Sequence, residues 1–369
     1  MIIELAEAFG KYNEQQWVDY HVAIENLISA HRSGWHLFSP SRRCAESLSA
    51  GCQLSFSQKE VFDSYIQPKI TTMSGQARSS DHTLLCIPDT EECKSERPNQ
   101  IVVPLSVFAD SRMVLPFQLI TENADSDGAT FEMISKAVAR FLGYNMPTYM
   151  DHVTGGGGTT GSCYAKALKE NRPTLCIVDS DQRFPSGPFG STARSVLSHG
   201  KSNEFGTVQA IVLPVRETEN LMPISFLLQV YSGNATVANV ISRFHEFRGL
   251  TFTNSSSQRV LSFLDLKLGE TEGKIAKIPD DFKEDIVKAC GKIFPSSKTL
   301  KFINEHSNEN ALPAVSFNLL KNTVEYIHKN KHQENLLAKK IMAAPFWSSI
   351  EGPIRKILSF SMAGARLPV

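Results

Sequence analysis

The chain has 369 residues, of which 41 % are hydrophobic and 21 % are charged, and its 38 basic residues balance its 38 acidic residues. This composition excludes a disordered, collagen-like or coiled-coil chain, and the length predicts about two domains. A net charge of zero also excludes a uniformly basic protein that is drawn to nucleic acid by its overall charge. Binding of DNA or RNA would therefore need a local excess of positive charge or a bound metal ion.

The sequence predicts a cytoplasmic protein that makes no contact with membranes. No stretch approaches the ~18 apolar residues of a membrane-spanning helix, and the acidic Glu4 and Glu7 do not suit a secretory signal. The seven cysteines lack the spacing of a zinc site or a disulfide framework, so we expect reduced thiols.

Residues 1–112 predict an α+β region whose role no motif indicates. Apolar side chains recur at helical spacing over residues 17–28, which predicts a helix. Strand-like runs follow at residues 83–87 and 101–107, with a polar loop between them.

Residues 113–270 predict a mostly parallel sheet flanked by helices, because short apolar runs alternate there with helical stretches. In chain order we expect a strand over 114–121, a helix over 129–142, a strand over 148–153, a glycine-rich turn, a helix over 162–170, a strand over 174–178, a helix near 191–199 and a strand over 207–213.

Residues 271–369 predict an all-helical region, with boundaries near 295–297 and 308–313. The last 79 residues hold eleven Lys and Arg against five Asp and Glu, an excess of six positive charges. A neutral chain therefore has a basic C-terminal region, which is available for a nucleic acid or a protein partner.

Acidic residues follow three of the predicted strands at their carboxyl ends. Asp179 and Asp181 come after one strand, Glu122 after another, and Glu217 and Glu219 after a third. Carboxyl ends of parallel strands meet at one edge of a sheet, where ligands bind. Converging carboxylates repel each other unless a cation lies between them, and such oxygen ligands suit Mg²⁺ or Mn²⁺. The alternatives are capping or solvated roles for the two aspartates and a helix N-terminal role for Glu217.

Four consecutive glycines, residues 155–158, open the helix predicted near 162. Such a loop either lets backbone amides approach a phosphate at the helix N-terminus or simply forms a turn. No G-x-x-x-x-G-K-[ST] sequence occurs in the chain, so it carries no Walker A motif of its own.

The order LITEN, TLCIVDSD, VRETENLMP and FLDLKLG over residues 113–270 resembles the Toprim fold, and within it the OLD-type nucleases and related effectors of bacterial anti-phage defence. The resemblance implies an endonuclease that hydrolyses phosphodiester bonds of DNA or RNA with two divalent ions. It implies that Glu122, Asp179 and Asp181 bind metal, that Glu217 or Glu219 completes a second metal position, and that Lys267 lies near the scissile phosphate. A separate ATPase subunit and a homodimer are implied as partners. In Toprim segments an Asp usually follows the Glu by four residues, whereas here Ser126 stands at that position, between Asp125 and Asp127.

Two other functions are compatible with part of this pattern. A glycosyltransferase that binds a nucleotide sugar through a D-x-D motif would explain Asp179 and Asp181 but not the three glutamates. A catalytically degenerate, Toprim-like interaction protein would explain the irregular ENADSD segment.

Overall fold

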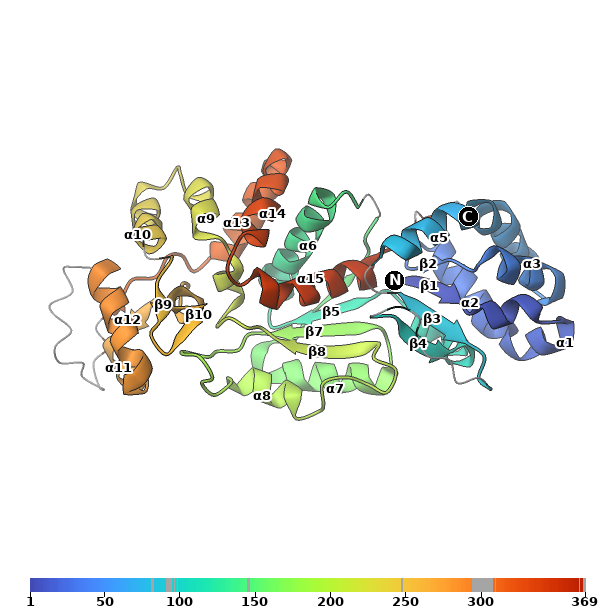
Figure 1. Cartoon of the computed structure of the whole chain (residues 1–369), viewed down its shortest axis with the longest axis horizontal. Helices are drawn as coiled ribbons and strands as arrows, with labels where there is room; N and C mark the ends of the chain where they lie inside the picture. The colour runs from blue at the N-terminus through green and yellow to red at the C-terminus, as the bar shows by residue number, and fades with distance from the viewer. Residues whose placement is uncertain are drawn as a thin grey trace.

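The computed structural model describes residues 1–80, 83–90, 95, 97, 99–144, 147–246, 248–293, 308, 310–364, 366 and 367. It has a mixed α/β architecture with two four-stranded parallel sheets that are flanked by helices (Figure 1). The body is elongated, with α1 (Glu14–Trp17) near one end and α11 (Glu272–Ala276) and α12 (Asp280–Ile293) near the other.

The central sheet has the strand order β6-β5-β7-β8, and all of its strands are parallel. Its middle strand β7 is buried along its whole length, which is why its sequence, TLCIV, is almost continuously apolar. The expected strands and helices of residues 113–270 are found with small shifts of their ends, except that the first strand begins at Gln118 and not at residue 114. Their bounds are β5 Gln118–Thr121, α6 Ala129–Phe141, β6 Asp151–Thr154, α7 Thr160–Glu170, β7 Thr174–Val178, α8 Ser191–Leu197 and β8 Val208–Val212.

Alternating side chains of the central strands pack into separate hydrophobic clusters on the two faces of the sheet. Leu175 and Ile177 belong to the large core that also contains the apolar side of α6. Cys176 and Val178 pack instead with residues of α7 and α8, such as Tyr164. Helix α6 therefore covers one face of the sheet, and α7 and α8 cover the other (Figure 1).

This arrangement places a topological switch point, which we call the crevice, between the carboxyl ends of β5 and β7. The chain leaves β5 toward α6 on one face, and it leaves β7 toward α8 on the opposite face. Ligands of open α/β sheets bind where neighbouring connections diverge in this way.

The N-terminal sheet has the order β2-β1-β3-β4, and all of its strand pairs are parallel. The expected α+β arrangement of residues 1–112 is therefore wrong, because all of these strands are parallel; helices connect β1 to β2 and β2 to β3, and residues 88–100 connect β3 to β4. The bounds are β1 Ile2–Leu5, α1 Glu14–Trp17, α2 His21–Arg32, β2 Leu37–Phe38, α3 Arg42–Gly51, α4 Phe56–Val61, α5 Ile70–Ser79, β3 Leu84–Ile87 and β4 Ile101–Pro104.

Beyond β8 the chain forms helices and short antiparallel strand pairs. The expectation of an all-helical region after residue 270 is wrong at β12, which pairs with β11 through Glu270 and Leu312. Three residues are too few to show a strand period in the sequence. The boundary expected at 295–297 lies outside the described residues. The bounds are α9 Ile224–Val230, α10 Ala235–Glu246, β9 Thr251–Phe252, β10 Ser255–Arg259, β11 Glu270–Thr271, α11 Glu272–Ala276, α12 Asp280–Ile293, β12 Asn310–Leu312, α13 Leu319–Lys329, α14 Glu334–Met342 and α15 Trp347–Ser361.

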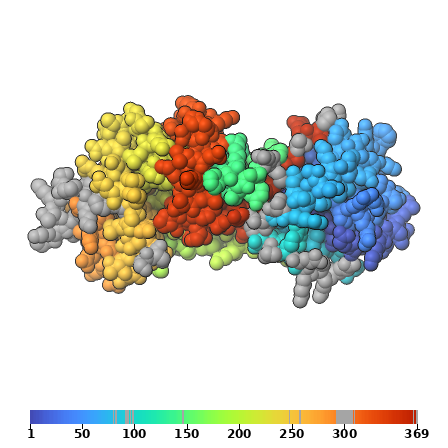
Figure 2. Space-filling model, turned by 45° about the horizontal axis from the view of Figure 1, so that its top comes forward, coloured from blue at the N-terminus to red at the C-terminus, as the bar shows by residue number. Residues whose placement is uncertain are grey.

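The C-terminal helices return to the middle of the molecule. Helices α14 and α15 pack against α6, and Phe360 of α15 meets Phe117 with ring centroids 5.5 Å apart. The amino group of Met1 donates to the carbonyl oxygen of Phe360 at 3.0 Å, so α15 also contacts the start of β1. In the space-filling view the red C-terminal residues accordingly lie between the yellow and the blue parts of the chain (Figure 2).

Candidate functional site

The candidate site lies in the crevice between β5 and β7, where Glu122 and Asp179 follow the two strands. Burial, reinforced by the charges of Asp181 and Asp127, raises the pKa of Glu122 to about 7, although a hydrogen bond from the backbone of Asp179 opposes this shift. The Oε1 atom of Glu122 is buried and has no hydrogen-bond partner. A buried carboxylate oxygen without a partner is costly, so this one suits a bound cation.

Asp179 joins the loop after β7 to the loop after β8. Its Oδ1 atom accepts hydrogen bonds from the backbone amide of Thr218 at 2.9 Å and from the Thr218 hydroxyl at 3.0 Å. Burial raises the pKa of Asp179 well above its usual value, and the carboxylates of Asp127, Glu219, Glu122 and Glu217 add to the shift. All of these acids are therefore close enough to influence a single carboxyl group.

Asp181 adopts a left-handed backbone conformation with a φ of 55°. Its amide donates to the carbonyl oxygen of Arg216 at 2.9 Å, which fixes the turn against the loop after β8. Its carboxylate packs against Gly190, where a Cβ atom would lie only 1.9 Å from Oδ2 of Asp181. The side chain is exposed to solvent, yet it raises the pKa of both Glu122 and Glu217.

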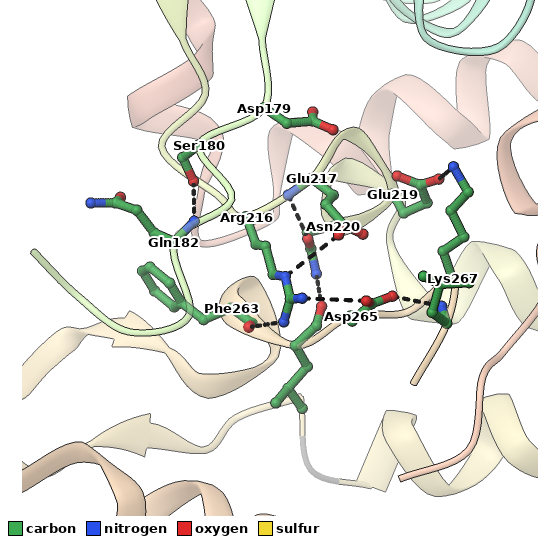
Figure 3. Close-up of polar contacts among 12 residues, drawn as sticks. Asp179, Ser180, Gln182, Arg216, Glu217, Glu219, Asn220, Phe263, Asp265 and Lys267 are labelled. Carbon is green, nitrogen blue, oxygen red and sulfur yellow. Dashed lines mark hydrogen bonds and ion pairs between the residues drawn. The ribbon is translucent and has the colours of Figure 1, made fainter. Parts of the chain in front are cut away.

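Glu217 and Glu219 flank the start of the short 3₁₀ helix η9 (Thr218–Leu221) (Figure 3). Glu217 occupies the N-cap position and its amide donates to Oδ1 of Asn220 at 2.9 Å, so the predicted alternative, a helix N-terminal acid, also holds. Burial raises the pKa of Glu217 to about 8 against the opposing charge of Arg216, and its Oε2 atom is buried without a partner.

Glu219 is buried and lies beside Lys267. Its Oε1 atom is 3.8 Å from Nζ of Lys267, whose charge partly opposes the upward pKa shift that burial causes in Glu219. Lys267 also lies over the ring of Phe317 at 5.2 Å and stays 39 % exposed at its side chain. The lysine lies in a turn and is the basic group next to Glu219 (Figure 3).

Asp127 belongs to the same cluster, although the sequence pattern did not single it out. The segment Ala124–Gly128 forms the π-helical turn η7, and the Gly128 amide donates to the Asn123 carbonyl oxygen at 3.2 Å. A π turn holds one residue more than an α-helical turn, so Asp127 takes the place that a fourth residue after Glu122 would occupy. Burial raises the pKa of Asp127, although its carboxylate accepts hydrogen bonds from the Asn123 amide and the Ser126 hydroxyl, each at 3.1 Å.

A buried ion network below the acids was also missed. Arg216, 5 % exposed, contacts Glu270, lies 3.3 Å from Asp265 through Nη2, and lies 3.5 Å from Glu217 through Nε. Lys274 is also 3.3 Å from Asp265. Arg216 thus ties the loop after β8 to residues 265–270, and Figure 3 shows its side chain between Glu217 and Phe263.

The glycine-rich loop closes around the end of β5 and does not point its first amides outward. The amides of Gly155 and Gly156 donate to the carbonyl oxygens of Thr121 and Glu122 at 2.7 and 2.9 Å. Gly156 and Gly157 have φ values of 71° and 59°, which explains the need for glycine. This loop therefore supports Glu122, and two of its amides are not available to a phosphate.

The donor set is compatible with a divalent cation. As the side chains stand, no group of three among the described residues forms a ready set of metal ligands. However, the raised pKa values and the two orphaned oxygens, Glu122 Oε1 and Glu217 Oε2, mark an excess of negative charge that a cation would relieve. Oxygen ligands alone suit Mg²⁺ or Mn²⁺.

Within the described residues, no helix is both long and apolar enough to cross a membrane. No family model matches the chain, and no curated protein or solved structure matches it significantly.

Proposed function

We propose that the chain is a divalent-metal-dependent nuclease of Toprim type, which hydrolyses phosphodiester bonds of DNA or RNA. The observation that carries the proposal is the convergence of acids from three strand ends on one crevice, with one lysine at its side. The residues that would hold Mg²⁺ or Mn²⁺ are Glu122, Asp127, Asp179, Asp181, Glu217 and Glu219.

The chemistry follows from this arrangement. Two divalent ions, when bound in such a site, activate a water nucleophile and neutralise phosphate oxygens. Lys267 would place its ammonium group against a phosphate oxygen and oppose the charge that develops there. Arg216 would hold Glu217 in the crevice, and Asp179 would keep the loops after β7 and β8 together through Thr218.

The π turn at Ala124–Gly128 supports an intact site over a degenerate one. The irregular ENADSD segment is the feature that favoured a degenerate site, and the turn brings Asp127 of this segment into the cluster. The proposal has three further parts. A separate ATPase subunit would supply the Walker A motif that this chain lacks. The chain would act as the effector in anti-phage defence, and two copies of it would form a homodimer.

A cleavage assay tests the proposal. Plasmid DNA and tRNA are incubated with the protein in Mg²⁺, Mn²⁺ or EDTA, beside an Asp179→Ala/Asp181→Ala variant. The matched control is Asp280→Ala/Asp281→Ala, which removes the same charge from two exposed acids of α12. We expect cleavage that needs the metal, survives in the control and is lost in the site variant.

Calorimetry of Mn²⁺ binding to the same three proteins gives a readout that needs no activating partner. Cleavage that is unchanged by the site substitutions, or absence of Mn²⁺ binding, would contradict the proposal. Binding of a nucleotide sugar that is lost in the site variant would favour a glycosyltransferase instead.

A further inference from the structure

A second cavity lies behind the loop that carries Glu217 and Glu219. Its volume is about 400 Å³, within the range of small-molecule sites, which is about 300–1,000 Å³. Its walls come from residues 220–225, from residues 248–266 and from residues 340–346 at the end of α14. The yellow and red parts of the chain that contribute these walls lie side by side in Figure 2.

Three cations line this cavity: Arg248, Arg259 and Lys340. Their hydrogen bonds to oxygen go to backbone carbonyls, since Lys340 donates to Ser225 at 3.0 Å, Arg248 to His245 at 2.7 Å and Arg259 to Gly249. None of the lining residues is acidic. Among the described residues, no carboxylate forms an ion pair with any of the three.

Two of these cations, Arg248 and Lys340, lie close enough to His245 to influence its pKa. Burial lowers the pKa of His245 and the positive charges of Arg248 and Lys340 lower it further, whereas the carboxylate of Glu246 opposes this shift. Burial also lowers the pKa of Lys340. The cavity lining therefore carries three cations and no acid, and an anionic group would find complementary charge there.

The rest of the lining is apolar. Met222, Leu261 and Leu266 form part of the wall, and Pro345 and Phe346 stand at the end of α14. Phe346 is only partly buried, so one part of its ring is free to contact a ligand. Inorganic phosphate alone would leave this apolar space empty, whereas a ligand with a flat aromatic ring beside its anionic group would also contact Phe346.

We propose that this cavity binds a nucleoside phosphate, with the phosphate on Arg248, Arg259 and Lys340 and the base against Phe346. Arginine side chains bind phosphate through paired N–H groups, and aromatic rings stack on any of the nucleotide bases. The same chemistry is offered by a free nucleotide and by the phosphorylated end of a nucleic-acid strand. The inference does not depend on the proposed nuclease activity.

The cavity is separate from the acid crevice but shares a wall with it. Asn220 lines the cavity, and its Nδ2 donates to the carbonyl oxygens of Leu261 at 2.9 Å and Leu264 at 3.0 Å. Its Oδ1 atom accepts from Glu217 on the other side. Binding is therefore best measured in EDTA, where metal at the acid crevice does not contribute.

Calorimetry with AMP, GMP, CMP and UMP, and with inorganic phosphate, tests the proposal on the whole chain in EDTA. We expect at least one nucleotide to bind more tightly than phosphate. In an Arg259→Gln/Lys340→Gln variant we expect the affinity to fall about tenfold or more, since each lost charged hydrogen bond weakens binding. Lys339→Gln, which removes the neighbouring exposed cation of α14, should bind like the unchanged protein.

Competition with short single strands separates the two sources of the ligand. Displacement of the nucleotide by a 5′-phosphorylated strand, but not by its 5′-hydroxyl counterpart, identifies a strand end as an occupant, whereas displacement by neither identifies a free nucleotide. Melting curves confirm that the variants fold. Equal nucleotide affinity in the double variant and in Lys339→Gln, or no binding at millimolar nucleotide, would overturn the proposal.

Discussion

The carbonyl oxygen of Asn123 accepts hydrogen bonds from the amides of both Asp127, at 2.9 Å, and Gly128, at 3.2 Å. This bifurcated pair forms the π turn at the start of α6 and sets the position of the Asp127 side chain. The carboxylate of Asp127 then raises the pKa of Glu122 and Asp179, which lie at the ends of β5 and β7. The turn holds one extra residue, and Asp127 still lies close enough to influence the carboxyl groups of Glu122 and Asp179.

The first prediction concerns the two acids of this turn. Asp127→Asn should lower the affinity for Mn²⁺ at least about tenfold, because it removes a carboxylate from the crevice. Asp125→Asn is the matched control, since Asp125 is exposed two residues earlier and should change the affinity less than about twofold. Calorimetry in both variants checks this. Equal losses would mean that the π turn does not select between the two acids.

The second prediction is a pH dependence of the metal-free protein. Glu122 and Glu217 have pKa values raised to about 7 and about 8 from 4.5, so the folded state holds protons that the unfolded state releases. The contribution of these protonated groups to stability is complete below pH ~4.5 and is lost as the pH rises through 7 and 8. The melting temperature in EDTA should therefore fall over this range, and Mn²⁺ should raise it more at pH 8 than at pH 6.

A Glu122→Gln/Glu217→Gln variant should remove much of this slope, because glutamine does not titrate. Glu60→Gln/Glu204→Gln, which changes two exposed glutamates far from the crevice, should leave the slope as it is. If the melting temperature falls with pH by the same amount in both variants, the titration of Glu122 and Glu217 is not the cause of the slope.

The central sheet could be predicted from the sequence because its signals are local. Alternation of apolar strands with helices fixes a parallel sheet, and acids directly after strands then fall at one edge. Glu122 and Asp179 follow from this rule. The parallel order of the N-terminal sheet could not be predicted, since β2 has only two residues and carries no period.

Arg216 and its partners show why part of the site escaped prediction. Phe263, Asp265 and Glu270 lie 47 to 54 residues farther along the chain, and no local pattern connects them to Arg216. Their contact depends on how η10 (Val260–Phe263) and β11 pack under the loop after β8. Asp127 escaped for another reason, because a π turn has no sequence signature that separates it from an α-helical turn.

The third prediction measures the contribution of Arg216. Arg216→Met should lower the free energy of unfolding by about 3–5 kcal/mol, because Glu270, 3 % exposed, would lose the cation that balances it and Asp265, also 3 % exposed, would keep only Lys274. Arg42→Met is the control, since Arg42 is 88 % exposed in an i,i+4 pair that contributes at most about 0.5 kcal/mol. Urea denaturation in EDTA gives both values, and similar losses would show that the buried network is not stabilising.

The last prediction uses Gly190 to move Asp181 without changing a carboxylate. Gly190 has an ordinary φ of −61°, so its backbone tolerates alanine, but the new Cβ atom would lie 1.9 Å from Oδ2 of Asp181 and 2.6 Å from its Cβ. Rotation of the Asp181 side chain cannot relieve a Cβ–Cβ distance of 2.6 Å, so the loop that carries Asp181 must shift and take the carboxylate with it. We expect Gly190→Ala to weaken Mn²⁺ binding as strongly as Asp181→Ala does.

Gly158→Ala is the matched control, because a Cβ atom at Gly158 has no neighbour within 4 Å although this glycine lies in the loop around Glu122. It should bind Mn²⁺ like the unchanged protein. Calorimetry on the three variants, with melting curves to confirm folding, decides the matter. Normal Mn²⁺ binding by Gly190→Ala, together with a loss in Asp181→Ala, would mean that the carboxylate acts from a position other than the one against Gly190.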